Sequence, residues 1–173
     1  MAEFKVHGPF RLETRKLHGG GRNIVRDDFW SSDGALEILR GSIGVYVFAI
    51  KPPRTETYTP CYVGQAKISF EKEALHDDKI LKYNTALGDY KSGSPHLFFL
   101  AHPRTKINQK QITELEDYLI IMGFVANPEI QNDKGAKLPK WAISGIVRSK
   151  TRKPTKSEKH VASRFVIKSK NGV

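Results

Sequence analysis

The segment from residue 112 to residue 122, Ile-Thr-Glu-Leu-Glu-Asp-Tyr-Leu-Ile-Ile-Met, constrains the fold more than any other part of the chain. On a helix, its apolar side chains recur three or four residues apart and share one face: Ile112, Leu115, Leu119 and Met122. At about 100° per residue, Glu116 falls between Ile112 and Ile120, inside that apolar stripe. The pattern predicts a helix that packs by its apolar face and carries one carboxylate within it.

A carboxylate in a buried face costs free energy unless a cation or hydrogen-bond donors meet it. Glu116 is therefore the residue on which we centre any chemistry of this chain. In the alternative interpretation, Glu116 lies at the margin of the stripe and reaches out to water or to a structural Arg or Lys.

Length and composition favour one domain with flexible ends, since 173 residues with 39% hydrophobic content suffice for a single core. Cys61 is the only cysteine, which excludes a disulfide framework and a Cys-based zinc site. No apolar run approaches the ~20 residues of a membrane span, and the first residues lack the order of a signal peptide. We therefore expect a cytoplasmic protein without a membrane partner.

The net charge of +11 is concentrated at the two ends of the chain. Residues 1–26 carry 6 Lys/Arg against 2 Asp/Glu, residues 27–147 carry 14 against 15, and residues 148–173 carry 9 against 1. Basic arms on a near-neutral body are typical of contacts with a nucleic-acid backbone. The candidate contacts in the tail are Lys150, Arg152, Lys153 and Lys156. A solubilising tail is the alternative interpretation, and the tail lacks the amphipathic spacing of a membrane-surface segment.

Three apolar runs predict a small sheet. Residues 43–50 are β-branched and aromatic throughout, and residues 61–64 form a shorter run beyond a loop with three prolines. These two runs predict a hairpin. Residues 96–101 are apolar without alternation, which predicts a central strand.

Helix signals lie between and after these runs. A short helix is predicted over residues 34–39 with Asp33 as its N-cap, and further helices are predicted after Ser69 and over residues 79–91. Asn108 caps the Glu116 helix, and Gly123 is expected to end it. The fold class is therefore α/β, with a small three-stranded, mainly antiparallel sheet flanked by helices.

Two strand tripeptides, Gly44-Val-Tyr46 and Tyr62-Val-Gly64, place tyrosines sixteen residues apart. A helix with Lys72 and His76 follows, and the last helix carries Leu115-Glu116-Asp-Tyr-Leu119-Ile120. In this order and at these spacings, residues 41–132 resemble the GIY-YIG nuclease family. The resemblance implies a nuclease domain over residues 41–147, between an N-terminal extension (1–40) and a basic tail (148–173).

The resemblance also implies roles for these side chains. Glu116 would hold one Mg²⁺ (or Mn²⁺), which tolerates a single carboxylate completed by water and substrate phosphate. Tyr46 would help to activate the attacking water and Tyr62 would orient it. Lys72 would stabilise the phosphate charge, and His76 would contact the phosphate or share the proton transfer.

The sequence departs from the family pattern at two places. Lys72 stands where the family usually has Arg, so a point charge replaces a bidentate fork. The family's final Asn is matched loosely by Asn132, with Asn127 as the alternative, and either would fix the metal side of the site.

Two hypotheses follow for the function. The first is a metal-dependent endonuclease that hydrolyses phosphodiester bonds in DNA, with the basic arms adding affinity for any sequence. The second is a catalytically degenerate, nucleic-acid-binding module on the same scaffold, in which Tyr46 and Tyr62 are strand aromatics and Lys72 and His76 form a solvated helix face. A third, weaker hypothesis is an adaptor whose basic tail binds an acidic protein.

Overall fold

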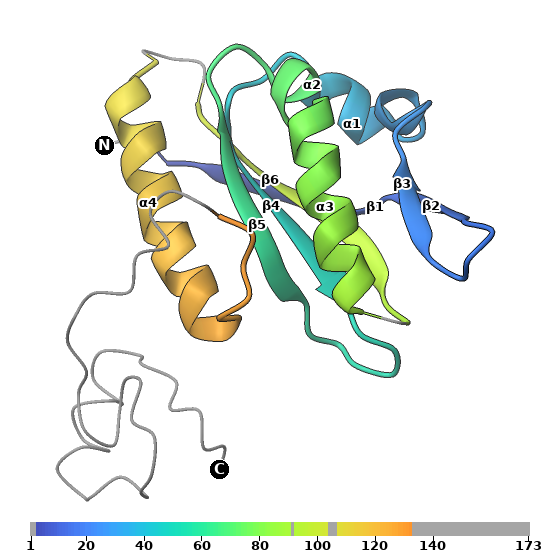
Figure 1. Ribbon diagram of the computed structural model, residues 1–173. Coiled ribbons are helices and arrows are strands. Elements are labelled where there is room, and N and C mark those ends of the chain that lie inside the picture. The colour runs from blue at the N-terminus through green and yellow to red at the C-terminus, as the bar shows by residue number, and fades with distance from the viewer. Residues whose placement is uncertain (1–2, 91, 104–106, 133–173) are drawn as a thin grey trace, which may run out of the picture. The chain divides into compact units, whose positions relative to one another are not determined.

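Six strands and five helical segments follow one another through the residues that the structure describes, 3–90, 92–103 and 107–132. In chain order, this computed structural model contains β1 (Lys5–Arg11), β2 (Glu13–Lys16), β3 (Arg22–Val25), η1 (Phe29–Ser31), α1 (Gly34–Leu39), β4 (Gly44–Lys51), β5 (Thr59–Ala66), α2 (Phe70–Glu73), α3 (Asp77–Asp89), β6 (Ser94–Ala101) and α4 (Gln109–Ala126) (Figure 1). The expected α/β class with a mainly antiparallel sheet is confirmed.

The main sheet has four antiparallel strands in the order β1-β6-β4-β5, and a separate two-stranded sheet pairs β2 with β3. β4 pairs on both sides, so Tyr46 lies opposite Gly64 of β5 and Phe99 of β6. The predicted hairpin and the central position of the strand at residues 96–101 are confirmed. The predicted number of three strands is wrong, because β1 adds a fourth.

The sequence hides β1 because little of it is buried. Most of its side chains are exposed, including Val6 at 67%, so the apolar–polar alternation that identifies a half-buried strand is missing. What holds β1 in place is backbone pairing with β6, which carries the buried Leu97 and Phe99.

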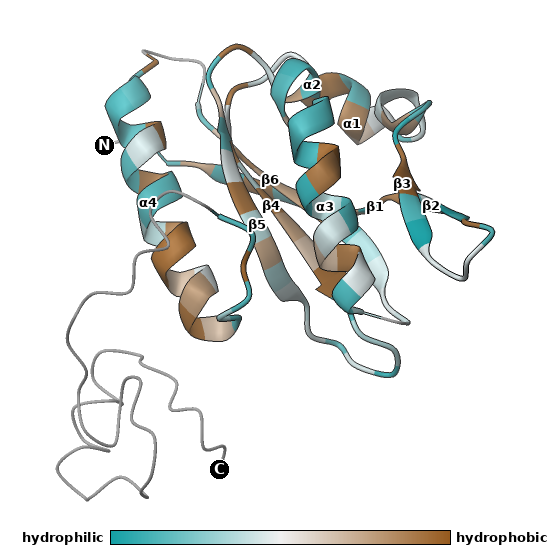
Figure 2. Cartoon of the chain, viewed as in Figure 1, coloured by the Kyte–Doolittle hydropathy of each residue, from teal (hydrophilic) through white to brown (hydrophobic). Residues whose placement is uncertain are grey.

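The two faces of the sheet carry separate hydrophobic clusters because side chains alternate along each strand. On one face, Phe48 of β4 stacks on Tyr83 of α3, with ring centroids 4.2 Å apart. On the other face, Val45 of β4 shares a cluster with Ile112 and Ile120 of α4. Helices α3 and α4 therefore cover opposite faces, and the central strands between them are the most apolar part of the fold (Figure 2).

The α4 helix matches its prediction at its start and differs at its end. Asn108 is the N-cap, and its side chain accepts the Lys110 N–H at 3.1 Å. Met122, predicted to lie on the packed face, is 44% exposed. Gly123 does not end the helix, which continues to Ala126. Gly123 is instead needed for close packing, because a Cβ there would lie 2.8 Å from the Ile130 Cδ1 atom.

The other helix caps agree with the sequence, and the loop prolines need one correction. Asp33 caps α1 and Ser69 caps α2 as predicted. The loop prediction for residues 51–60 is too long, since β5 already begins at Thr59 and includes Pro60. An edge strand tolerates this proline because only one of its sides is paired. Within the described segments, no helix is both long and apolar enough to cross a bilayer.

Candidate functional site

The two motif tyrosines lie together on the face of the sheet that α3 covers. Their ring centroids are 6.3 Å apart, and the side chains are almost fully buried, with 0% of Tyr46 and 7% of Tyr62 exposed. The glycine of Tyr62-Val-Gly64 makes this arrangement possible, because a Cβ at Gly64 would lie 2.5 Å from both the Cζ and the hydroxyl oxygen of Tyr46. The strand pairing therefore explains why tyrosine and glycine occur together in the two tripeptides.

We expect Gly64→Ala to lower the free energy of unfolding by about 1–3 kcal/mol, because overpacking forces Tyr46 or the strand to move. Gly88→Ala is the matched control, since nothing lies within 4 Å of a Cβ there. Gly88 lies inside α3, so its replacement should stabilise by about 0.5–1 kcal/mol. Urea unfolding measures both changes. Equal stability of Gly64→Ala and the unmodified chain would contradict the contact with Tyr46.

Tyr46 itself is a poor candidate for activating water. Burial raises its pKa well above the ordinary value, and negative charge at Tyr62 and at Glu73 raises it further. Its hydroxyl donates a long hydrogen bond of 3.5 Å to the Glu73 carbonyl oxygen. A buried phenol that stays protonated supports the position of Tyr62 but cannot accept a proton at neutral pH. The water-activating role implied for Tyr46 therefore disagrees with its surroundings.

Tyr62 lies next to two lysines of α3. The Nζ atoms of Lys79 and Lys82 are 5.9 and 5.7 Å from the centroid of its ring. Burial raises the pKa of Tyr62, and attraction to Lys79 offsets part of this rise. Both lysines are on the same helix face because they are three residues apart.

Lys79 is held charged by its partners. Partial burial lowers its pKa, but a hydrogen bond with Asp78 and the attraction to Tyr62 outweigh this and leave the pKa raised. The Asp78 carboxylate also lies 2.8 Å from the Nδ1 atom of His76. A chain of polar contacts therefore runs from His76 through Asp78 and Lys79 to Tyr62.

Glu116 approaches the same group of side chains from α4. Its pKa is raised, first by burial and then by Asp117, whereas a hydrogen bond from the Gln65 backbone and the charges of Lys67 and Lys79 act in the opposite direction. Negative charge on Glu116 also contributes to the raised pKa of Tyr62, after burial. Glu116 is thus within electrostatic range of both Tyr62 and Lys79, although α3 and α4 pack on opposite faces. The predicted place of Glu116 between Ile112 and Ile120 is confirmed by the burial of both isoleucines.

The raised pKa of Glu116 predicts how stability depends on pH. A carboxyl group whose pKa is raised by folding stabilises the fold fully below its ordinary pKa of 4.5, and this contribution is lost as the pH rises through the folded value. Glu116→Gln removes the titration. From about pH 4 to neutral pH, the native chain should therefore lose stability relative to this variant. Urea unfolding of both proteins over a pH series measures the difference, and a constant difference would contradict a raised pKa.

The two candidate asparagines bind the edge of β5. Asn132 accepts the Val63 N–H at 3.0 Å and donates to the Val63 carbonyl oxygen at 2.7 Å. Asn127 donates to the Pro60 carbonyl oxygen at 2.8 Å and is buried. A hydrogen bond from the Gln65 backbone to Glu116 lies along the same edge strand. Both amides therefore hold the edge that carries Tyr62, and the metal-side role implied for Asn132 or Asn127 stays a prediction.

We expect Asn132→Ala to lower the free energy of unfolding by about 1–3 kcal/mol, because it leaves both polar groups of Val63 without their partner. Gln131→Ala is the matched control. Its backbone N–H still donates to the Cys61 carbonyl oxygen, so the change should stay within about 0.5 kcal/mol. Equal effects of the two substitutions in urea unfolding would show that Asn132 does not secure the edge.

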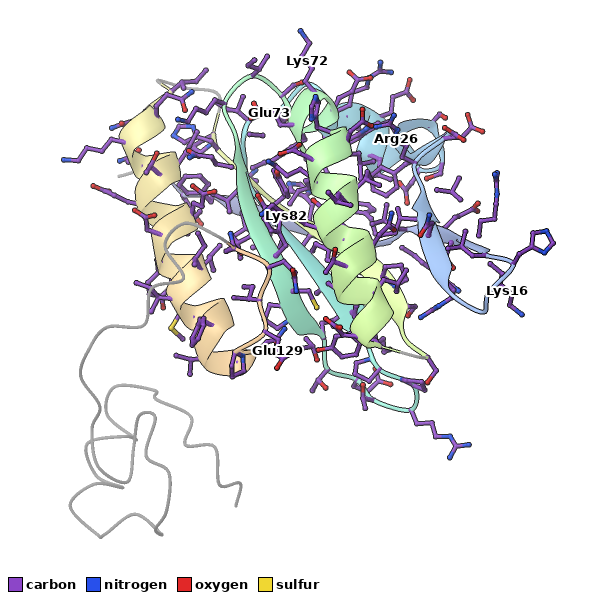
Figure 3. All side chains as sticks on the ribbon, viewed as in Figure 1. Lys16, Arg26, Lys72, Glu73, Lys82 and Glu129 are labelled. Atoms are coloured by element: carbon purple, nitrogen blue, oxygen red, sulfur yellow. The ribbon has the colours of Figure 1, made fainter. Side chains whose placement is uncertain are left out.

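Lys72 lies apart from the Tyr62 group, and His76 is connected to it only through Asp78 and Lys79. The helix that should carry both ends at Glu73, and His76 is the extended N-cap of α3. Lys72 points away from the sheet, whereas Lys82 lies between α3 and β5 (Figure 3). Lys72 and His76 instead line a shallow pocket of about 370 Å³ with Trp30. The cations next to Tyr62 are Lys79 and Lys82, and the sequence interpretation missed both.

The donor set around Glu116 fits a weakly held, hard cation. In the described part of the chain, no group of three or more His, Cys, Asp or Glu side chains could hold a metal ion. Glu116 would be the single carboxylate ligand, an arrangement that Mg²⁺ or Mn²⁺ accepts when waters and substrate phosphates complete the shell. Four residues of the tail were predicted to contact a nucleic-acid backbone, and all of them lie outside the described residues: Lys150, Arg152, Lys153 and Lys156.

Comparison with known proteins adds no relative from which a function could be transferred: no protein-family model, curated protein or solved structure matches the chain.

Proposed function

We propose that the chain is a metal-dependent endonuclease whose site consists of Tyr62, Lys79 and Glu116. The observation that supports this most is the ammonium of Lys79 (α3) beside the phenol of Tyr62 (β5), with the half-buried carboxylate of Glu116 (α4) within electrostatic range of both. Hydrolysis of a phosphodiester requires an activated water, a cation near the phosphate and charge relief at the leaving oxygen. These three side chains are of the types that supply such functions.

Each side chain has a distinct part in this proposal. The Lys79 ammonium neutralises negative charge on the phosphate, and its hydrogen bond with Asp78 holds it in position. The Tyr62 hydroxyl, kept protonated by burial, donates to a phosphate oxygen or to the attacking water. Glu116 holds the divalent ion, which when bound lowers the pKa of a coordinated water and polarises the phosphate. Tyr46 supports Tyr62 from within the core.

The substrate class follows from charge. The full chain has a net charge of +11, and its excess of Lys and Arg lies near the two ends. Such an excess attracts a polyanion without regard to its sequence. DNA is the substrate that we propose, and RNA is tested beside it.

Plasmid nicking tests the proposal. The full chain is incubated with supercoiled plasmid, single-stranded DNA and RNA, in Mg²⁺, in Mn²⁺ and in EDTA. The expected result is nicked and linear DNA with either metal and intact DNA in EDTA. Intact substrates under every condition, at protein concentrations where a gel-shift assay shows binding, would overturn the proposed activity.

A nucleic-acid-binding module without cleavage is the second candidate. Two observations favour it: the complete burial of Tyr46, and the position of Lys72 away from the tyrosines. This candidate predicts binding that weakens with salt and no cleavage of any substrate in the same nicking experiment.

A further inference from the structure

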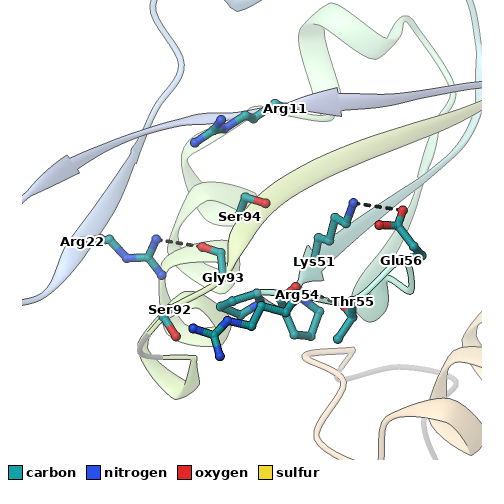
Figure 4. Close-up of a pocket in the computed structure, with 11 residues that line it drawn as sticks. Arg11, Arg22, Lys51, Arg54, Thr55, Glu56, Ser92, Gly93 and Ser94 are labelled. Atoms are coloured by element: carbon teal, nitrogen blue, oxygen red, sulfur yellow. Dashed lines mark hydrogen bonds and ion pairs between the residues drawn. The ribbon is translucent and has the colours of Figure 1, made fainter.

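A cluster of basic side chains lies at the opposite end of β4 from Tyr46. Lys51 ends β4, and around it is a cavity of about 540 Å³ between the loop after β4 and the start of β6. Three arginines join Lys51 in its lining: Arg11 from β1, Arg22 from β3 and Arg54 from the loop (Figure 4). We call this the basic pocket. Four cations from three separate stretches of the chain, around residues 11, 22 and 51–54, line the same pocket.

Arg11 and Arg22 also line a neighbouring cavity with Glu13, Asp27 and Asp28, but the lining of the basic pocket itself carries little negative charge. Its lining contains one carboxylate, Glu56, which is 3.4 Å from the Lys51 Nζ atom and whose side chain is 96% exposed. An ion pair exposed to this extent contributes little. Arg11 and Arg54 form no ion pair with any described residue, and Arg22 donates only to the carbonyl oxygens of Gly93 and Tyr90, at 2.8 and 3.1 Å.

The positive charge of the basic pocket also affects the pKa of His96. Burial lowers its pKa most, and the charges of Arg11 and Lys51 lower it further although the Ser94 carbonyl opposes them. His96 is opposite Arg11 in the pairing of β1 with β6, and its ring packs against Tyr58. Fixed backbone acceptors already orient Arg22, which lowers the entropy lost when an anion binds.

We propose that the basic pocket binds a phosphate group of a nucleic-acid backbone. Guanidinium groups suit this ligand because they present several donors in a planar fork. Tyr62 lies opposite Phe48 of β4, three residues before Lys51, which corresponds to about 10 Å along the strand, or roughly three base steps of a duplex. The inference rests on the proposed function only in taking nucleic acid as the ligand.

Salt-dependent DNA binding tests the basic pocket separately from catalysis. The measurement uses the full chain with Glu116→Gln, in EDTA, and a labelled 20-base-pair duplex. The pocket variant carries Arg11→Gln and Arg54→Gln, and Arg22 is left intact because it bonds to the backbone. The control variant carries Arg40→Gln and Lys110→Gln, two exposed cations outside both the basic ends and the pocket, with the same total change of charge. Urea unfolding confirms that both variants fold.

We expect the slope of log K against log salt to become shallower in the pocket variant and not in the control variant. Each phosphate contact contributes about 0.9 to the slope of log K against log salt, so the pocket variant should lose roughly 1 in slope and up to about 10-fold in affinity near 0.1 M salt. The control variant should keep the slope of the parent. Equal slopes for the two variants would overturn the inference. Nicking by the native chain is scored independently, so either conclusion can fail while the other holds.

Titration with inorganic phosphate tests whether the basic pocket binds a nucleic-acid backbone or a small free anion. Phosphate and a nucleoside monophosphate are titrated into the parent and the pocket variant, and binding is followed by calorimetry. The inference expects weak, millimolar binding to the parent together with the large effect on DNA. Micromolar binding of either small anion, with DNA affinity unchanged in the pocket variant, would identify the pocket as a small-anion site and overturn the backbone assignment.

Discussion

Replacement of Glu116 by Gln should lower the single-turnover rate of DNA cleavage in Mg²⁺ by at least about 10²-fold and should leave the fold intact. The amide oxygen of Gln can still accept the hydrogen bond from the Gln65 backbone, and the packing between Ile112 and Ile120 is unchanged. Only the negative charge is lost. A single carboxylate that holds a divalent ion cannot be replaced by a neutral amide without loss of the ion.

Glu114→Gln is the control for this substitution. Glu114 is on the same helix, is exposed, and lies 3.8 Å from the Lys110 Nζ atom. It should cleave within about 2-fold of the native rate because an exposed pair contributes little. Rates are measured with enzyme in excess over plasmid, and near-ultraviolet circular dichroism verifies folding. Native rates in both variants would remove Glu116 from the reaction.

The second large effect concerns which lysine neutralises the charge of the phosphate. Lys79→Gln should lower the cleavage rate by about 10²-fold, because it removes the ammonium that lies beside Tyr62. Lys72→Gln, with the same change of charge, should stay within about 3-fold, since Lys72 is exposed and lines a different pocket.

A Lys79→Arg variant separates charge from general damage to the fold. It keeps a cation at the Tyr62 ring, so it should recover part of the rate that Lys79→Gln loses. The measured quantities are the single-turnover rate and the affinity for plasmid DNA in EDTA. A larger loss for Lys72→Gln than for Lys79→Gln would restore the assignment that the family resemblance implied.

Periodicity alone located α4 and Glu116, because burial on a helix follows directly from the order of apolar residues. Periodicity could not place Lys72. The prediction put Lys72 and His76 on one face of a single helix, but that helix ends at Glu73 and a new one begins at Asp77. The bend at His76 does have a signal in the sequence. Asp77 and Asp78 follow it, and acidic residues are favoured in the first turn of a helix. A helix predicted to start there would have placed Lys79 and Lys82 on one face of α3.

Other parts of the fold depend on contacts that no local pattern carries. β1 is recruited by backbone hydrogen bonds to β6, and its exposed side chains leave no apolar signal. The roles of Asn132 and Gly64 depend on which residue lies opposite, Val63 in one case and Tyr46 in the other. The basic pocket combines β1, β3 and β6 with the loop after β4, so it exists only once the sheet has formed.

Paramagnetic broadening by Mn²⁺ tests the central claim most directly, because it locates the ion without relying on activity. At substoichiometric Mn²⁺, the amide signals of Glu116, Gln65 and Tyr62 should weaken first in the native chain and should keep their intensity in Glu116→Gln. Broadening that is strongest elsewhere in the chain, or that is the same in both proteins, would contradict a metal-dependent site at Glu116.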